Sequence, residues 1–141
     1  MTAGGPQPVP SAETRPFWAG LAAHELRLPW CSGCGRFEHP RAIRCPRCLR
    51  EPVWRRISGR ASVASWTVVH RPLVPGLAPP YVVGTVCPDE QPDLVLDTRL
   101  AAAPQDLRTG TPVEVVYHDD PRGFTVHAFR VRRAADGIAG R

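Results

Sequence analysis

The stretch Cys31-Ser-Gly-Cys34-Gly, followed ten residues later by Cys45-Pro-Arg-Cys48, decides the fold of this chain. Each Cys-x-x-Cys turn directs two sulfurs toward one point, and two such turns complete a tetrahedral shell of four thiolates. Gly33 and Gly35 suit the positive-φ positions after the first ligand, and Pro46 stiffens the second turn. The spacing is shorter than the commonest zinc spacings, but it still predicts a zinc ribbon. Chance clustering and disulfides are the alternatives.

The predicted metal is one structural Zn²⁺ per chain. Four thiolates close the coordination shell, so no position remains for water or substrate. A rubredoxin-like iron site would use similar turns. The second turn is basic and contains Pro46, so iron is the less favoured interpretation. His39 could replace one thiolate, although four cysteines already complete the shell.

The 141 residues suffice for one domain or two small modules. The chain begins without the apolar core of a secretory signal and has no run long enough to span a membrane. We therefore expect a cytoplasmic protein, in which paired cysteines bind metal more often than they form disulfides. The net charge of +5 comes from arginine alone, since lysine is absent. Arginine suits phosphate and carboxylate, which leaves nucleic acid, a phosphorylated cofactor and an acidic partner open.

Before the ribbon, residues 1–14 are rich in proline and glycine and predict a disordered lead-in. Residues 15–29 predict a short docking helix with Thr14 as its possible cap. A helix of about ten residues is marginal alone. Its leading aromatics, Phe17 and Trp18, therefore indicate docking, either on the chain's own domain or on another subunit.

Residues 30–57 predict the ribbon itself, in the order strand, turn, crossover, turn, strand. A module of this size buries too little apolar surface to fold alone, so metal would supply much of its folding energy. Its predicted small core consists of Trp30, Phe37, Ile43 and Trp54.

Residues 58–132 change to alternating apolar and polar positions, which predict strands. A helical turn at 104–110 lies between the third and fourth strands, an order that predicts a five-stranded OB-fold barrel, although other small barrels remain possible. The expected fold class is mainly β, with an N-terminal helix, a rubredoxin-like zinc ribbon and this barrel, and with a loose tail at 133–141. The five strands are expected at 58–70, 81–87, 94–100, 112–118 and 124–131.

Catalytic motifs are absent from the sequence: it has no phosphate loop, nucleophile elbow or His-Glu-x-x-His helix. Cys87 lies mid-strand, where a thiol is usually a small buried hydrophobe. His70 is better placed, at a strand end, but such a histidine more often packs than catalyses. His118, with 119–120, is expected in a solvated turn, and His127 in a strand. The chain is therefore not expected to be catalytic alone.

The loop 71–80 has four prolines and one glycine, which make it semi-rigid. Leu73, Val74, Leu77 and Tyr81 are apolar residues in or beside this surface segment. A pre-ordered apolar loop loses little entropy when it docks, so we expect a docking surface here. The alternative is a plain hairpin that proline stiffens.

Several motifs agree in order and spacing with one family. The chain resembles the DUF35 OB-fold family, also described as acyl-CoA-associated zinc-ribbon/OB-fold proteins, from about Phe17 to Val131. The resemblance rests on the two cysteine turns, on a Phe-Trp-x-Gly-Leu opening, and on the segments 58–60, 65–72, 78–83 and 110–117.

The resemblance implies an accessory subunit that binds a thiolase-fold partner. Such partners are thiolases, lipid-transfer-protein-like aldolases or acyltransferases, and some members bind or are fused to MaoC-type hydratases. The partner would bind most of the acyl-CoA, and the barrel would dock near the acyl-CoA channel. The implied zinc ligands are Cys31, Cys34, Cys45 and Cys48. The implied contacts with the partner or its channel are Phe17, Trp18, His70, Arg71, Pro79, Pro80 and Tyr81.

The sequence is compatible with three hypotheses for the function. The first is a subunit of an acyl-CoA-processing complex that forms or cleaves C–C bonds or transfers acyl groups, and it explains the missing active site. The alternative is a module that binds single-stranded nucleic acid. That function needs exposed aromatics along a basic groove, whereas here the arginines gather on the ribbon. A free enzyme using His70 or Cys87 is the least favoured.

Overall fold

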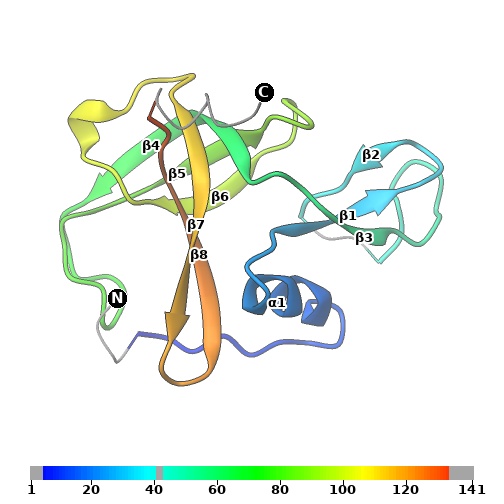
Figure 1. The fold of residues 1–141 in the computed structure, drawn as a ribbon, viewed down its shortest axis with the longest axis horizontal. Coiled ribbons are helices and arrows are strands. Elements are labelled where there is room, and N and C mark those ends of the chain that lie inside the picture. Colours follow the sequence, from blue (N-terminus) through cyan, green and yellow to red (C-terminus); the bar gives the residue numbers. More distant parts are fainter. Residues whose placement is uncertain (1–4, 41–42, 134–141) are drawn as a thin grey trace.

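The chain folds into a barrel with a small sheet and one helix beside it (Figure 1), in a computed structural model that describes residues 5–40 and 43–133. The small sheet has the strand order β2-β1-β3. Its neighbour, the helix α1, packs between this sheet and the barrel strand β8. These elements are α1 (Arg15–Ala22), β1 (Arg27–Cys31), β2 (Arg36–Phe37) and β3 (Val53–Arg56).

Five strands close into a barrel in the order β4-β5-β6-β8-β7. Only the β6–β8 pair is parallel, with Leu100 opposite Phe129, and the remaining pairs are antiparallel. A 3₁₀ turn, η1 (Pro104–Asp106), connects β6 to β7. This arrangement confirms the predicted OB-fold barrel. The barrel strands are β4 (Arg60–Val69), β5 (Tyr81–Pro88), β6 (Leu96–Leu100), β7 (Pro112–Asp120) and β8 (Phe124–Val131).

Branched and aromatic side chains fill the barrel, because alternate residues of each strand point inward. Val63, Val86, Val113 and Phe129 are almost completely buried. The β4–β5 register shifts between Val63 and Ser65, which bends the strand. Gly84 lies opposite this bend, where a Cβ atom would come within 2.4 Å of the Ser65 carbonyl oxygen. Close approach of two backbones therefore requires glycine here.

Helix α1 docks on the chain's own barrel. Leu21 is completely buried, and Phe17 and Trp18 are half-buried against the barrel core. Thr14 occupies the N-cap position but makes no side-chain cap bond, since its hydroxyl bonds to Ser11 instead. The Glu25 N–H closes the helix by donating to the Gly20 carbonyl, which leaves His24 with a φ of 54°.

Several local expectations were wrong. Ile43 is 65% exposed, so the ribbon core is formed by Trp30 and Phe37, whose rings pack edge to face at 4.7 Å. Gly33 does not have a positive φ; a Cβ there would lie 2.9 Å from the side chain of the exposed Arg50.

Strand boundaries also differ from the expected ones. The third barrel strand begins at Leu96, and the expected turn residues 119–120 belong to β7. The lead-in is described from residue 5, whose carbonyl accepts a hydrogen bond from Arg122. The expected loose tail, from residue 134 on, lies outside the described residues. In the described ranges no helix has the length and apolarity needed to cross a bilayer.

Candidate metal centre and docking loop

Four cysteine sulfurs converge at the end of the ribbon. All four Sγ atoms lie within 4.8 Å of one another, although the ligands come from two separate turns. The Sγ atoms of Cys31 and Cys48 are 3.3 Å apart, and those of Cys34 and Cys45 are 3.8 Å apart. None of the four forms a disulfide. The predicted ligand set is therefore assembled in the geometry of one metal site.

The two cysteine turns repeat the same backbone geometry. Gly35 donates its N–H to the Cys31 carbonyl at 2.8 Å, and Leu49 donates to the Cys45 carbonyl at 2.9 Å. The φ angles of Gly35 and Leu49 are 64° and 62°. The position after each second cysteine is thus left-handed, and in the second turn leucine occupies a conformation that favours glycine.

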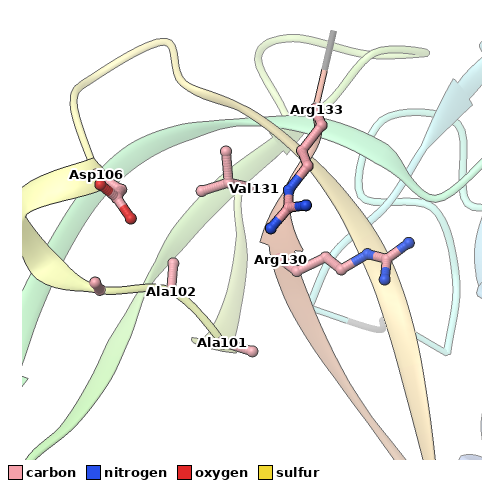
Figure 2. Close-up of a pocket in the computed structure, with 7 residues that line it drawn as sticks. Ala101, Ala102, Asp106, Arg130, Val131 and Arg133 are labelled. Carbon is pink, nitrogen blue, oxygen red and sulfur yellow. The ribbon is translucent and has the colours of Figure 1, made fainter. Parts of the chain in front are cut away.

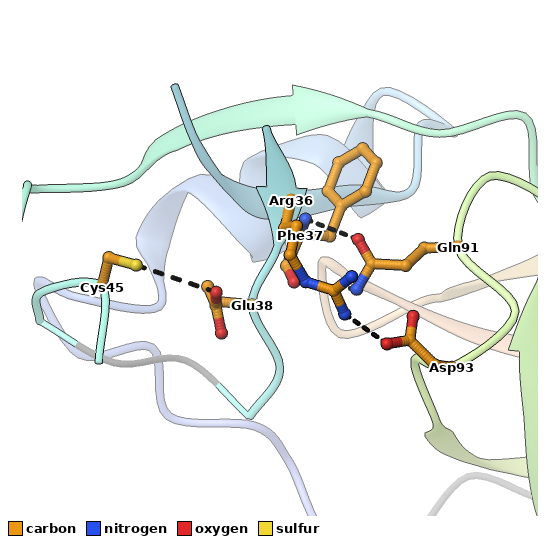
Figure 3. A network of polar contacts seen from close by, with 6 residues as sticks. All are labelled: Arg36, Phe37, Glu38, Cys45, Gln91 and Asp93. Carbon is orange, nitrogen blue, oxygen red and sulfur yellow. Dashed lines mark hydrogen bonds and ion pairs between the residues drawn. The ribbon is translucent and has the colours of Figure 1, made fainter. Parts of the chain in front are cut away.

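The donor set suits a cation. A hydrogen bond with the Cys48 sulfur, and then burial, raises the pKa of the Cys34 thiol to about 12. A bound divalent cation reverses this effect, because it deprotonates a coordinating thiol outright. Four convergent sulfurs match Zn²⁺ or an iron centre and leave no open coordination position. Glu38 is nearby, with its Oε1 3.8 Å from the Cys45 sulfur (Figure 3).

A polar joint connects the ribbon to the barrel (Figure 3). Gln91, in the β5–β6 connection, is buried; its Oε1 accepts from the Phe37 N–H at 2.8 Å, and its Nε2 donates to the Phe37 carbonyl at 3.1 Å. Arg36 pairs with Asp93 in the same connection, which lowers the pKa of that carboxyl. This joint could not be predicted from the sequence, because its two sides are more than fifty residues apart.

The structure separates the predicted docking residues into exposed and buried positions. His70 and Arg71 are exposed at the start of the loop, and the Leu73 side chain is 69% exposed. Pro80 is also exposed, whereas Tyr81 is buried, 7% exposed, at the start of β5. Tyr81 therefore forms the base of the loop, and beyond Arg71 the exposed residues of the loop have no charged or polar side chain.

Two cavities meet at the end of the barrel beside this loop, sharing the small side chains of residues 101–103. One, of about 400 Å³, is lined by His70, Tyr81, Arg99 and apolar neighbours. The other, of about 640 Å³, has Asp106 on one side and Arg133 on the other (Figure 2). These cavities were not foreseen, because the barrel closure brings β4, β5, β6 and β8 together there.

A cluster of side chains around His24 was also not predicted from the sequence. His24, after α1, stacks on the Tyr117 ring at 5.0 Å, and its Nε2 lies 3.0 Å from Asp119 Oδ1. Thr125 donates to the same carboxylate at 2.7 Å. Hydrogen bonds from His24 and Thr125 lower the pKa of Asp119. The cluster fixes the end of the helix to the β7–β8 hairpin.

His127 is a β8 residue, as expected, with its ring edge-on to Phe17. Burial, and secondarily the charge of His39, lowers the pKa of His127 to about 4. Within the described part of the chain, no histidine is hydrogen-bonded to a serine, threonine or cysteine side chain that could act as a nucleophile. Cys87 is only half-buried on β5.

Comparison with known proteins gives the same architecture. A sequence model of the C-terminal OB-fold domain of ChsH2 matches residues 54–118. The 3-oxo-4,17-pregnadiene-20-carboxyl-CoA hydratase alpha subunit of Mycobacterium tuberculosis (strain ATCC 25618 / H37Rv) is 34% identical over 116 residues. That match covers 82% of this chain but 37% of the relative, so the chain spans little more than a third of the relative's length.

Two solved structures share the fold. A chain of the "Ltp2-ChsH2(DUF35) aldolase" superimposes with a TM-score of 0.79 at 27% identity, covering 89% of this chain and 98% of that one. A DUF35-family protein of unknown function from Sulfolobus solfataricus gives a TM-score of 0.62 at 19% identity, over 86% and 87% of the two chains.

The fold and the cysteine centre define a two-module protein that joins a ribbon with a candidate metal site to an OB-fold barrel. The ChsH2 domain match and the DUF35 structures specify that class further. This chain belongs to the DUF35 OB-fold family.

Proposed function

We propose that this chain is an accessory zinc-binding subunit of an acyl-CoA-processing complex, and that it docks on a thiolase-fold partner near the partner's acyl-CoA channel. The observation that carries the proposal is the similarity to the DUF35 chain of an Ltp2–ChsH2 aldolase, which extends over nearly all of that chain. The relative from the hydratase makes a MaoC-type hydratase a further partner. A cytoplasmic location is part of the proposal.

The metal is Zn²⁺, held by Cys31, Cys34, Cys45 and Cys48. It has a structural role, because a closed shell of four thiolates cannot bind a substrate. The reaction takes place on the partner, which also binds most of the acyl-CoA. We assign Phe17, Trp18, His70, Arg71, Pro79, Pro80 and Tyr81 to the contact with the partner or its channel. Of these, the exposed loop residues meet the partner directly, while Tyr81 lies at the base of the loop and the helix aromatics pack against the barrel core.

Co-expression with the thiolase-fold protein encoded beside this chain tests the proposal. The two proteins should co-elute in size-exclusion chromatography, and Leu73→Asp should prevent co-elution without changing the folded state, since Leu73 is exposed. Val95→Asp is the matched control, because Val95 is an exposed apolar residue outside the loop. This variant should still co-elute with the partner. Failure of the wild-type chain to co-elute, together with salt-sensitive binding of single-stranded oligonucleotides, would support the nucleic-acid alternative instead.

A further inference from the structure

The cavity of about 400 Å³ opens at the base of the docking loop, at the barrel end where β4 finishes and β5 begins. Its walls are mainly apolar and include Val68, Leu100 and the alanines 101–103. Two groups that can carry positive charge, His70 and Arg99, lie among these walls. The cavity therefore combines an apolar floor with the guanidinium of Arg99 and the imidazole of His70.

Of the four half-buried arginines in residues 5–40 and 43–133, Arg27 and Arg36 pair with carboxylates, whereas Arg99 and Arg132 do not, and of these two Arg99 lines the cavity. It is half-buried on β6, opposite Val83 of β5. Arg36, Arg122 and Arg130 each pair with a carboxylate, whereas no carboxylate of residues 5–40 or 43–133 lies within ion-pair distance of Arg99. A partly desolvated guanidinium is stabilised by a carboxylate, which it binds through two parallel hydrogen bonds. The ligand that completes this site is therefore anionic.

The position of the cavity indicates what supplies that anion. The loop 71–80 leaves the barrel directly after His70 and returns at Tyr81, and both residues line the cavity. A protein that covers the loop would also cover the cavity. Sites for small molecules enclose most of their ligand, whereas this cavity is open on one side, as expected of a pocket that a second protein surface closes.

We infer that this cavity is the anchor pocket of the interface: it receives an apolar side chain of the partner, and Arg99 binds an aspartate or glutamate beside that side chain. Binding energy in interfaces concentrates in such pockets, where a large side chain is fully desolvated. The inference rests on the proposed function and adds the chemistry of the surface that the partner must present: an apolar residue next to a carboxylate.

Affinity measurements on the full-length zinc-loaded chain and the neighbouring thiolase-fold protein test the inference. Arg99→Met keeps the aliphatic stem and removes the charge, and it should weaken binding by about 10- to 100-fold and flatten the salt dependence. Arg60→Met is the control, because Arg60 is an exposed arginine at the opposite end of β4. It should bind as the wild type does.

Ala103→Phe provides a second, independent variant, because a phenyl ring on this wall fills the cavity. It should also weaken binding by at least about tenfold, while melting temperature and zinc content show that the chain is folded. If both cavity variants bind like the wild type, the anchor pocket is refuted and the accessory-subunit proposal stands. If the wild type does not bind, both fail.

The competing occupant is a small molecule. Isothermal titration of the isolated chain with octanoyl-CoA examines it directly. Saturable binding that disappears in Arg99→Met but not in Arg60→Met would assign the cavity to an acyl thioester and overturn the inference. Absence of binding by the isolated chain, with loss of partner affinity in both cavity variants, is the result that supports it.

Discussion

The ribbon and the barrel are stabilised in different ways. Among the described residues of the ribbon sheet and its turns, two of the five buried residues are cysteines of the metal site, and the others are Leu28, Pro29 and Phe37. In the barrel the buried residues are almost all aliphatic or aromatic, and they form most of one continuous cluster, to which the ribbon adds Leu28 and Phe37. From this contrast we expect the ribbon to rely mainly on its cysteine centre and the barrel on side-chain packing.

Metal removal should give the largest difference between the two parts. Binding of a structural Zn²⁺ contributes about 10–16 kcal/mol in small zinc modules, so Cys45→Ser should unfold the ribbon and remove the ion. Amide hydrogen exchange should show loss of protection in β1–β3 while β4–β8 stay protected, and elemental analysis should fall from one zinc per chain to none. Cys87→Ser is the control, and it should keep both the protected ribbon amides and the one zinc per chain. Protected ribbon amides in metal-free protein would contradict the comparison.

A truncation in the barrel core should destabilise the barrel and leave the metal site of the ribbon intact. Phe129 is 1% exposed, so Phe129→Ala should lower the free energy of unfolding by about 3–5 kcal/mol. Urea unfolding measures this loss, and the zinc content of the folded fraction should not change. Val95→Ala, at a position 46% exposed, should cost much less. Loss of zinc from folded Phe129→Ala protein would show that the two parts are not independent.

Removing the Gln91 hydrogen bonds that join the ribbon to the barrel should cause an intermediate loss in the free energy of unfolding. Gln91→Ala leaves the N–H and carbonyl of Phe37 without their partners, and buried groups of this kind cost about 1–3 kcal/mol each when unsatisfied. Chemical unfolding should detect the loss, and ribbon amides should exchange faster while zinc remains bound. Gln105→Ala, an exposed glutamine in η1, serves as the control. An unchanged exchange pattern would mean that Gln91 does not hold the ribbon.

Acid should destabilise the barrel side through His127. Its folded-state pKa, about 4, lies below the ordinary value of 6.5, so the unfolded state binds more protons between these values. Stability should therefore fall as the pH drops from about 6.5 toward 4, by at most about 2–3 kcal/mol. Urea titrations of the wild type and His127→Phe at equal zinc content should diverge in this range. Parallel curves would exclude His127 as the source.

The architecture could be predicted because its signals are local. The cysteine spacing indicated the ribbon, and alternating side chains with a helical turn before the fourth strand indicated the barrel. Ile43 was misplaced because an apolar residue between two metal turns has no periodic neighbours to show which way it faces. The positive φ expected at Gly33 was wrong, because in this turn the left-handed position is the one after the second cysteine, Gly35.

Contacts between distant segments could not be predicted. Gln91 and Phe37, like His24 and Asp119, are brought together by closure of the barrel and docking of α1. Neither pair has a spacing that a single sequence reveals. In the described ranges no carboxylate lies within ion-pair distance of Arg99, and this too could not be predicted, because it depends on how the surrounding surface is assembled.

The Gln91 amide has one more consequence. Strand β2 is an edge of the three-stranded sheet, and the Phe37 backbone groups that Gln91 binds are those a fourth strand would use. One carboxamide offers the same donor and acceptor as a peptide unit, so this side chain imitates a neighbouring strand and caps the edge. An uncapped edge is a template for pairing with another chain. The glutamine thus protects the ribbon against edge-to-edge aggregation.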